Sequence, residues 1–223
     1  MPPSDDQGIT AVANGTRRSR FIAAALAVAL GVGGTSMVGY AVTHQQVAPQ
    51  PSLAAADPQG PQTATTVLPA ARPISIRIPA INVSSPVNSV GLNPDHTMET
   101  PNPGPFFDQA AWYRYSPTPG QLGPSVIVGH LDSAEGPSVF FKLGAVKPGQ
   151  RIEVTRADHT TATFEVDSVE SFPKNGFPSR TVYGDIDYPA LRLITCGGSF
   201  DKAIGSYRDN VVVFAHLIEP VPA

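Results

Sequence analysis

The stretches LRLITC at residues 191–196 and NVVVFAHLI at 210–218 decide the predicted fold. Both are short apolar runs rich in β-branched residues, and such runs are typical of strands that are buried on two faces. A third run of this kind, SVIVGHL, occupies residues 125–131. Because segments dense in glycine and proline separate these runs, we predict a mainly β domain.

Working outward from these runs, ISIRIPAI at 74–81 and RIEVTR at 151–156 begin with the period-two alternation of strands with one buried face. Weaker strand signals are VNSVGL at 87–92 and TATFEVDSV at 161–169. Seven or eight short strands in a domain of about 150 residues predict a closed barrel or a sandwich. The stretches FFDQAAWYRY and PSVFFKLGAV, at 106–115 and 137–146, are expected to form short helical turns.

The N-terminal part of the chain has the pattern of a membrane anchor. Arg17, Arg18 and Arg20 precede an uncharged stretch at 21–43, whose length of about 23 residues lets a helix cross about 30 Å of hydrocarbon. Basic residues before the span predict a cytoplasmic segment at 1–20, a type II single-pass transmembrane anchor at 21–43, and everything later outside the cell membrane. A signal peptide cleaved near residues 54–56 remains the alternative.

Two further segments follow the anchor. Residues 44–72 are rich in alanine and proline and poor in large apolar side chains, so we predict an extended linker. The domain that carries the strands then occupies residues 73–223. The net charge of the whole chain is −3, and its basic residues do not form the stripe that binds phosphate backbones. Nucleic acid is therefore not an expected partner.

Metal and cofactor signatures are missing from the sequence. One cysteine and five histidines show neither the C-x-x-C nor the H-x-x-x-H spacing of zinc sites. Asp95, Glu99, Asp185 and Asp187 lie in predicted loops without an EF-hand pattern, so solvated carboxylates are favoured over a calcium site. We expect no metal and no cofactor.

Cys196 is the first candidate for chemistry. It is the only cysteine, so it has no disulfide partner within the chain. In an exported protein an odd cysteine indicates a reactive thiol or pairing between chains. A small buried hydrophobe is the alternative, because free cysteine often has that role.

A cysteine nucleophile needs a neighbour that favours its thiolate and a donor for the oxyanion that forms on an attacked carbonyl. His130 follows the run at 125–129 and precedes LDSAEG, where a strand ends and a loop opens, so it is the favoured histidine. Arg208 stands just before the last strand, and a hairpin returning from Cys196 brings it back toward the thiol. Its planar donors suit an oxyanion or a carbonyl. One alternative is that Arg208 is only an exposed arginine at a strand start. Another candidate is Arg192, which lies on the same strand and face as Cys196 but could be only a neighbour.

The motifs SVIVGHLDS, LRLITCGGSFD and YRDNVVVFAHL, in this order, resemble the His, Cys and Arg motifs of sortases, the cell-wall-anchoring cysteine transpeptidases of Gram-positive bacteria. The resemblance covers residues 73–220. Among the sortase classes it is most similar to actinobacterial class F, with class E second. The family signature TLxTC is matched at Leu193, Thr195 and Cys196, whereas Arg192 stands where the family has threonine.

This resemblance implies an eight-stranded β-barrel with His130, Cys196 and Arg208 as catalytic residues and Thr195 as a substrate-binding residue. The implied reaction cleaves an LPxTG-like sorting signal between Thr and Gly through a thioacyl intermediate. The implied partners are surface proteins with C-terminal sorting signals and an amine acceptor from a cell-wall precursor. The loop at about 172–188 corresponds to the family's region for recognising the sorting signal.

Two other functions are compatible with parts of the sequence. L,D-transpeptidases are also extracellular cysteine acyl-transferases, but their S-H-G-C-type motif does not surround Cys196. A membrane-tethered β-domain that only binds wall polymer or protein, with a structural cysteine, is the alternative from another class. Thiol labelling of the folded domain separates this binding module from an enzyme.

Overall fold

The computed structural model describes residues 46–52, 66–101 and 104–218 of the chain. Contacts divide the chain into a unit at Met1–Val47 and a unit at Ala48–Ala223, and the fold described below is that of the second unit. The segments predicted at 1–20 and 21–43 lie outside the described residues. Among the helices of the described residues, none has the length and apolar character needed to cross a membrane.

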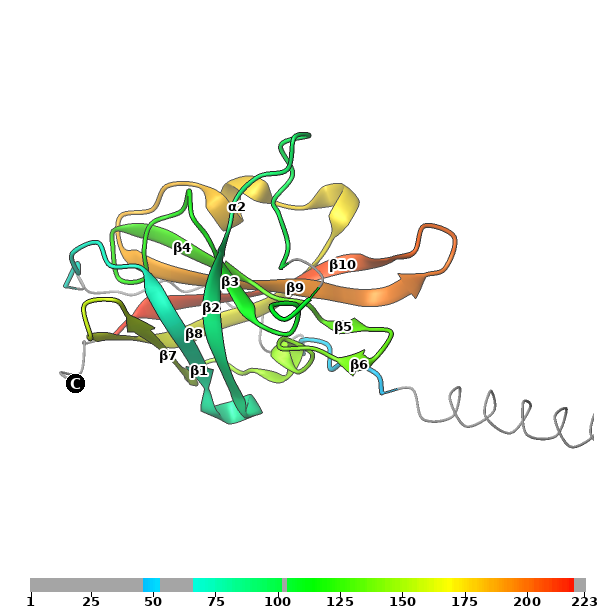
Figure 1. The fold of residues 1–223 in the computed structure, drawn as a ribbon, viewed down its shortest axis with the longest axis horizontal. Helices are drawn as coiled ribbons and strands as arrows, with labels where there is room; N and C mark the ends of the chain where they lie inside the picture. The colour runs from blue at the N-terminus through cyan, green and yellow to red at the C-terminus, as the bar shows by residue number, and fades with distance from the viewer. Residues whose placement is uncertain (1–45, 53–65, 102–103, 219–223) are drawn as a thin grey trace, which may run out of the picture. The chain divides into compact units, whose positions relative to one another are not determined.

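Eight strands form a closed barrel, as the family resemblance implies (Figure 1). Around the barrel they follow the order β1-β2-β3-β4-β9-β10-β8-β7. The barrel strands are β1 (Pro73–Ile78), β2 (Val83–Val90), β3 (Ala110–Tyr113), β4 (Gly123–Val128), β7 (Arg151–Arg156), β8 (Thr161–Pro173), β9 (Pro189–Asp201) and β10 (Ser206–Leu217).

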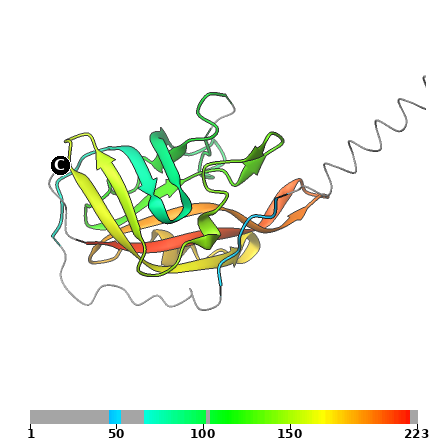
Figure 2. The ribbon, with the colours of Figure 1, turned by 90° about the horizontal axis from the view of Figure 1, so that it is seen from below.

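The β2–β3 and β4–β9 pairs are parallel, and the other neighbours around the barrel are antiparallel. The antiparallel pairing of β1 with β7 closes the barrel. A separate two-stranded hairpin consists of β5 (Asp132–Ser133) and β6 (Gly136–Pro137). Both views show the paired ends of β9 and β10 extending past the other strands (Figures 1 and 2).

The helical elements in the described part of the chain are short: η2 (Pro79–Ile81), η3 (Leu143–Ala145), η4 (Lys174–Gly176) and α2 (Ser179–Tyr183). Element η3 confirms the helical turn expected within residues 137–146. The helical turn expected at 106–115 is wrong, because this stretch contains β3. Ala110 and Trp112 pack in the barrel core while Ala111 joins a cluster on the other face, so burial on both faces overrides the weak helical signal.

Two apolar clusters lie on opposite faces of the same strands. Leu191 and Leu193 of β9 belong to the main core inside the barrel, with no exposed surface. Ile194 belongs to a second cluster on the outer face, with Val126 and Val128 of β4 and Val212 and Phe214 of β10.

The outer cluster is covered by the segment that links β8 to β9. Val182 of α2 is fully buried in it, and Phe177 from the same segment packs against it. Burial on both faces explains the continuous apolar runs in the sequence, as predicted for them. The outer face of β4, β9 and β10 is also where the candidate site lies.

Candidate functional site

The thiol of Cys196 lies in the second half of β9, where Cys196 pairs with Asn210 of β10. It is half-buried and forms no disulfide. The side chain packs against a small cluster of the buried residues Ala48, Leu131 and Phe141. The thiol is therefore held by apolar neighbours and still has surface exposed to solvent.

His130 lies level with Cys196, because β4 and β9 are parallel neighbours. Val128 pairs with Ile194, and the backbone N–H of Gly129 donates to the Ile194 carbonyl at 3.2 Å. His130 follows Val128 by two residues, just past the end of β4, and Cys196 follows Ile194 by two residues in β9. A Cβ on Gly129 would lie only 2.7 Å from the Phe140 ring, so a residue without a side chain is needed at this close approach.

The imidazole of His130 is fixed by the loop that precedes β3. Its ring stacks on Phe107, with 4.1 Å between the ring centroids. Its Nε2 lies 2.9 Å from the Pro101 carbonyl oxygen. Because a carbonyl oxygen only accepts, Nε2 carries the hydrogen in this contact, which leaves Nδ1 as the ring nitrogen that can take up a proton.

Arg208 occupies an irregular position of β10. The register shifts between Tyr207, which pairs with Phe200, and Asp209, which pairs with Gly197. The Arg208 Nη2 atom lies 3.0 Å from Asp201 Oδ2, and 65% of the side chain is exposed. The hairpin thus returns the backbone of Arg208 to within two residues of Asn210, the partner of Cys196, while its guanidinium binds an acidic side chain of the hairpin.

Lys174 contacts the thiol directly and was missed by the sequence analysis. Its Nζ lies 3.5 Å from Cys196 Sγ and donates to Ser206 Oγ at 2.9 Å. It is part of η4, directly after β8. The only signal in the sequence was its position within the loop at 172–188, and nothing in the pattern indicated that this lysine faces the cysteine.

A tyrosine–carboxylate pair lies beside the same cluster. The Tyr207 hydroxyl donates to Asp132 Oδ2, and the Tyr207 ring packs against the residues around Cys196. Burial, followed by this hydrogen bond, raises the pKa of Tyr207. Tyr207 therefore stays neutral at physiological pH and connects the β5–β6 hairpin to β10.

Apart from Ala48, the site residues described above all lie within the part of the chain that matches a known protein family. A family model described as "Sortase domain" matches residues 76–218. The chain belongs to the sortase family. Sortases act as transpeptidases.

Solved sortases share this fold. Sortase A from Corynebacterium diphtheriae is 24% identical with a TM-score of 0.51, and the match covers 68% of this chain and 63% of that chain. Sortase C-1 from Actinomyces oris is 18% identical with a TM-score of 0.51, covering 65% of this chain and 73% of that chain. Sortase A from Listeria monocytogenes is 19% identical with a TM-score of 0.50, covering 68% and 90%. No curated protein sequence matches this chain.

A segment that precedes the matched sortase domain also contacts the site. The Gly198 backbone N–H donates to Gln50 Oε1 at 3.0 Å, and Gly198 adopts a positive φ of 70° there. A Cβ on Gly144 would lie 2.2 Å from the Pro49 carbonyl oxygen, so this glycine permits the close approach. Residues 48–50 therefore run beside the cysteine of the sortase domain.

Thr195 and Arg192, at two positions of the family signature, lie on opposite faces of β9. Thr195 is only 3% exposed, and its hydroxyl has no hydrogen-bond partner among the described residues. Arg192 lies on the outer face with Ile194 and Cys196, because alternate residues of a strand share a face. Arg192 is also 3% exposed, so this departure from the sortase signature places a buried cation under the loop that links β8 to β9.

Proposed function

We propose that this chain cleaves an LPxTG-like C-terminal sorting signal between Thr and Gly and transfers the protein to an amine of a cell-wall precursor. Membership of the sortase family supports this reaction class. The observation that carries the proposal is the environment of Cys196. Its thiol is partly accessible, with an ammonium group 3.5 Å away and the histidine-bearing end of β4 at the same level.

In the first half of the reaction, Nδ1 of His130 takes the proton of the Cys196 thiol. The thiolate then attacks the carbonyl carbon of the Thr residue. The Lys174 ammonium stabilises the thiolate, because a positive charge close to a thiol favours its ionised form. His130 returns the proton to the Gly nitrogen as the C–N bond breaks, which leaves the acyl group on sulfur as a thioester.

In the second half, the amine acceptor attacks the thioester carbonyl and gives its proton to His130. Collapse of this tetrahedral intermediate breaks the C–S bond and forms the new amide, and the thiolate is restored. Arg208 donates to the carbonyl oxygen as its negative charge develops, which requires its guanidinium to exchange Asp201 for the substrate. Thr195, expected from the resemblance to bind substrate, is almost fully buried, so the proposal gives it an indirect role beneath the strand beside which the peptide binds. Water in place of the amine gives hydrolysis.

The proposal includes the setting of the enzyme. The anchor at 21–43 holds the chain in the cell membrane as a single-pass type II protein, with the catalytic domain outside. Surface proteins and the cell-wall amine then meet the enzyme on the same side. The motif order and the FD that follows LITCGG support class F, with class E as the second assignment.

The decisive experiment compares Cys196→Ala with the wild-type protein on an LPxTG peptide, with and without an added amine. We expect the alanine variant to lose cleavage and the covalent acyl-enzyme that mass spectrometry detects in the wild type. Ser199→Ala, at an exposed position of the same strand, serves as the matched control and retains activity. Cleavage by the Cys196→Ala variant at the wild-type rate contradicts the proposal. A thiol that reacts with iodoacetamide only after unfolding instead favours the binding module.

A further inference from the structure

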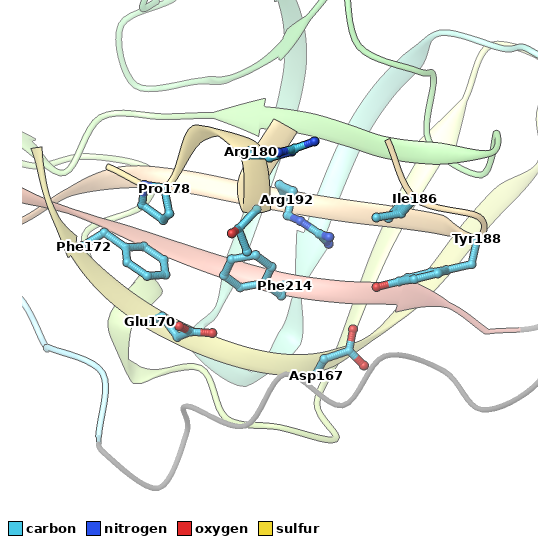
Figure 3. A pocket seen from close by; sticks show the side chains of 10 residues that line it. Asp167, Glu170, Phe172, Pro178, Arg180, Ile186, Tyr188, Arg192 and Phe214 are labelled. Carbon is cyan, nitrogen blue, oxygen red and sulfur yellow. The ribbon is translucent and has the colours of Figure 1, made fainter. Parts of the chain in front are cut away.

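A cavity of about 470 Å³ lies under the segment that links β8 to β9 (Figure 3). Its floor comes from the outer faces of β8, β9 and β10, and the segment with α2 contributes its other side. Pockets for small ligands usually measure about 300–1,000 Å³, so this cavity has room for an organic group larger than water. Phe214 provides an apolar surface inside it.

Arg192 is the most unusual residue of this cavity. Its guanidinium stacks on Phe214, with 4.7 Å from Cζ to the ring centroid, and Nη1 donates to the Leu191 carbonyl at 3.2 Å. Its buried Nε has no hydrogen-bond partner, and no ion pair of Arg192 occurs among the described residues. A guanidinium has five N–H donors, and burying a cation without an opposite charge is unfavourable. The side chain therefore has unused capacity to bind an anion.

The acidic side chains that line the cavity already have partners of their own. Asp167 Oδ1 lies 2.5 Å from His216 Nδ1, and Glu170 Oε1 accepts a hydrogen bond from Ser168 at 2.9 Å. Arg180 of α2 adds a second positive charge to the lining.

Figure 3 shows how the polar groups are directed within the cavity. The head group of Arg192 and the Tyr188 hydroxyl point toward each other on one side of the Phe214 ring. Burial is the main influence on Arg192 and lowers its pKa, while Tyr188 and Asp167 act in the opposite direction. The Tyr188 hydroxyl accepts a hydrogen bond from the Arg192 guanidinium in the free protein. An incoming anion takes the place of this contact and meets both groups as donors, with the aromatic surface of Phe214 beside them.

We propose that this cavity binds a carboxylate group, with the Arg192 guanidinium as its charge partner and the Tyr188 hydroxyl as a second donor. Guanidinium and carboxylate geometries match, and hydrogen bonds between charged groups are stronger than neutral ones. The apolar part of the ligand packs on Phe214. Carboxylates are a better match than phosphates, because the Asp167 and Glu170 carboxylates repel a more highly charged group.

Two sources can supply this carboxylate. Arg192 lies four residues before Cys196 on the same face of β9, a distance of about 13 Å along an extended strand. An acidic side chain four residues before the Thr of a sorting signal, directly before its Leu, reaches Arg192 if the peptide follows β9 with its Thr beside Cys196. This source rests on the proposed function. The other source is a free small carboxylic acid, which does not depend on it.

The first arm of the test uses a small probe on the full chain. N-acetyl-L-glutamate and its uncharged analogue N-acetyl-L-glutamine are titrated by calorimetry. We expect the carboxylate to bind at least about tenfold more tightly than the amide, and Arg192→Gln to remove this preference. Arg192→Lys keeps the charge and loses part of the affinity, since one ammonium does not reproduce the planar donors. Tyr188→Phe gives a smaller loss without removing a buried charge.

Arg151→Gln is the matched control, because it removes one exposed positive charge on β7, away from the cavity. It should leave the titration unchanged. Circular dichroism and thermal unfolding of each variant show whether the fold is retained. If Arg192→Gln does not fold, the comparison of Arg192→Lys and Tyr188→Phe with the wild type decides the outcome.

The second arm uses a pair of sorting peptides with Glu or Gln directly before the Leu of the LPxTG motif, four residues before its Thr. A lower KM for the Glu peptide in the wild type, lost in Arg192→Gln, assigns the carboxylate to the sorting signal. Binding of N-acetyl-L-glutamate without a difference between the peptides assigns a free carboxylic acid, and this result stands even if no peptide is cleaved. If neither arm shows a preference for the carboxylate over its uncharged amide, the proposal is overturned.

Discussion

The two faces of β9 differ in where their neighbours come from. On the inner face, Leu191 and Leu193 are fully buried by other apolar side chains of the barrel. On the outer face, Arg192 lies beside polar groups from the segment after β8, and Cys196 contacts Lys174 of that segment and packs in a small cluster with Tyr207 from the start of β10. The inner face holds the barrel together, and the outer face carries the candidate chemistry.

This difference shows how one strand serves two purposes. The inner positions need only apolar side chains of the right volume, so their role follows from the alternation of β9 itself. The outer positions acquire their role from residues far away in the chain. Lys174 precedes Cys196 by 22 residues, and the register of a parallel neighbour brings His130 level with it.

The largest expected effect on the free energy of unfolding comes from truncating a buried side chain on the inner face. Leu193→Ala leaves a cavity in the barrel core and should lower the free energy of unfolding by about 3 kcal/mol. Ile194→Ala, on the outer face next to it, should cost less, because 7% of Ile194 is exposed and the segment with α2 has more freedom to close the gap. Urea unfolding of the two variants and the wild type measures this difference. An equal or larger cost for Ile194→Ala contradicts the division between the faces.

The barrel strands were predictable from the sequence, because long apolar or alternating runs dominate them. The exception is instructive. Ala110 and Trp112 belong to a strand, yet FFDQAAWYRY offers no alternation strong enough to predict one. Its strand state comes from pairing with β2 and β4, which are contacts between distant segments.

The candidate site was predictable only where a motif marks it. Cys196 and His130 stand at the end of a strand-like run and Arg208 just before one, so position and motif agree on them. The contact of Lys174 with the thiol depends on how η4 crosses back over β10, and no local pattern encodes that path. Arg192 was visible as a departure from the family signature, but its cavity exists only once α2 is folded over the outer face.

The next expected effect separates the roles of Lys174 and Arg208. Lys174→Met should slow alkylation of Cys196 by iodoacetamide at pH 7 by about tenfold, because the thiolate loses its neighbouring positive charge. Lys174→Arg keeps the charge and should stay close to the wild-type rate. Since Cys196 is the only cysteine, the second-order rate constant reports on this site alone.

Arg208→Met provides the contrast. The Arg208 guanidinium binds Asp201 in the free protein, so its loss should leave alkylation nearly unchanged. It should still reduce cleavage of a sorting peptide, because the proposed role of Arg208 begins when a carbonyl oxygen develops charge. If Arg208→Met slows alkylation more than Lys174→Met does, Arg208 rather than Lys174 stabilises the thiolate.

The smallest expected effect concerns Asp167, which lines the cavity and pairs with His216 on β10. This hydrogen bond raises the pKa of His216 above its ordinary value of 6.5, against a smaller lowering by burial. A histidine with a raised pKa in the folded state stabilises the fold fully below its unfolded pKa, and this stabilisation is lost as the pH rises through the folded pKa. Asp167→Asn should therefore cost about 1 kcal/mol at pH 5.5, a modest value because the pair is partly solvated, and much less at pH 9.

Asp158→Asn supplies the control for this pH dependence, because Asp158 pairs with Arg156 Nη2 at 3.2 Å. Arginine does not titrate between pH 5.5 and 9, so the cost of this substitution should be the same at both pH values. Urea unfolding at the two pH values measures all four free-energy differences. A cost for Asp167→Asn that does not fall between pH 5.5 and 9 would mean that His216 is not held protonated by Asp167. Asp167 would then face only a neutral imidazole, and its negative charge near Arg192 would weaken the case for a carboxylate ligand in the cavity.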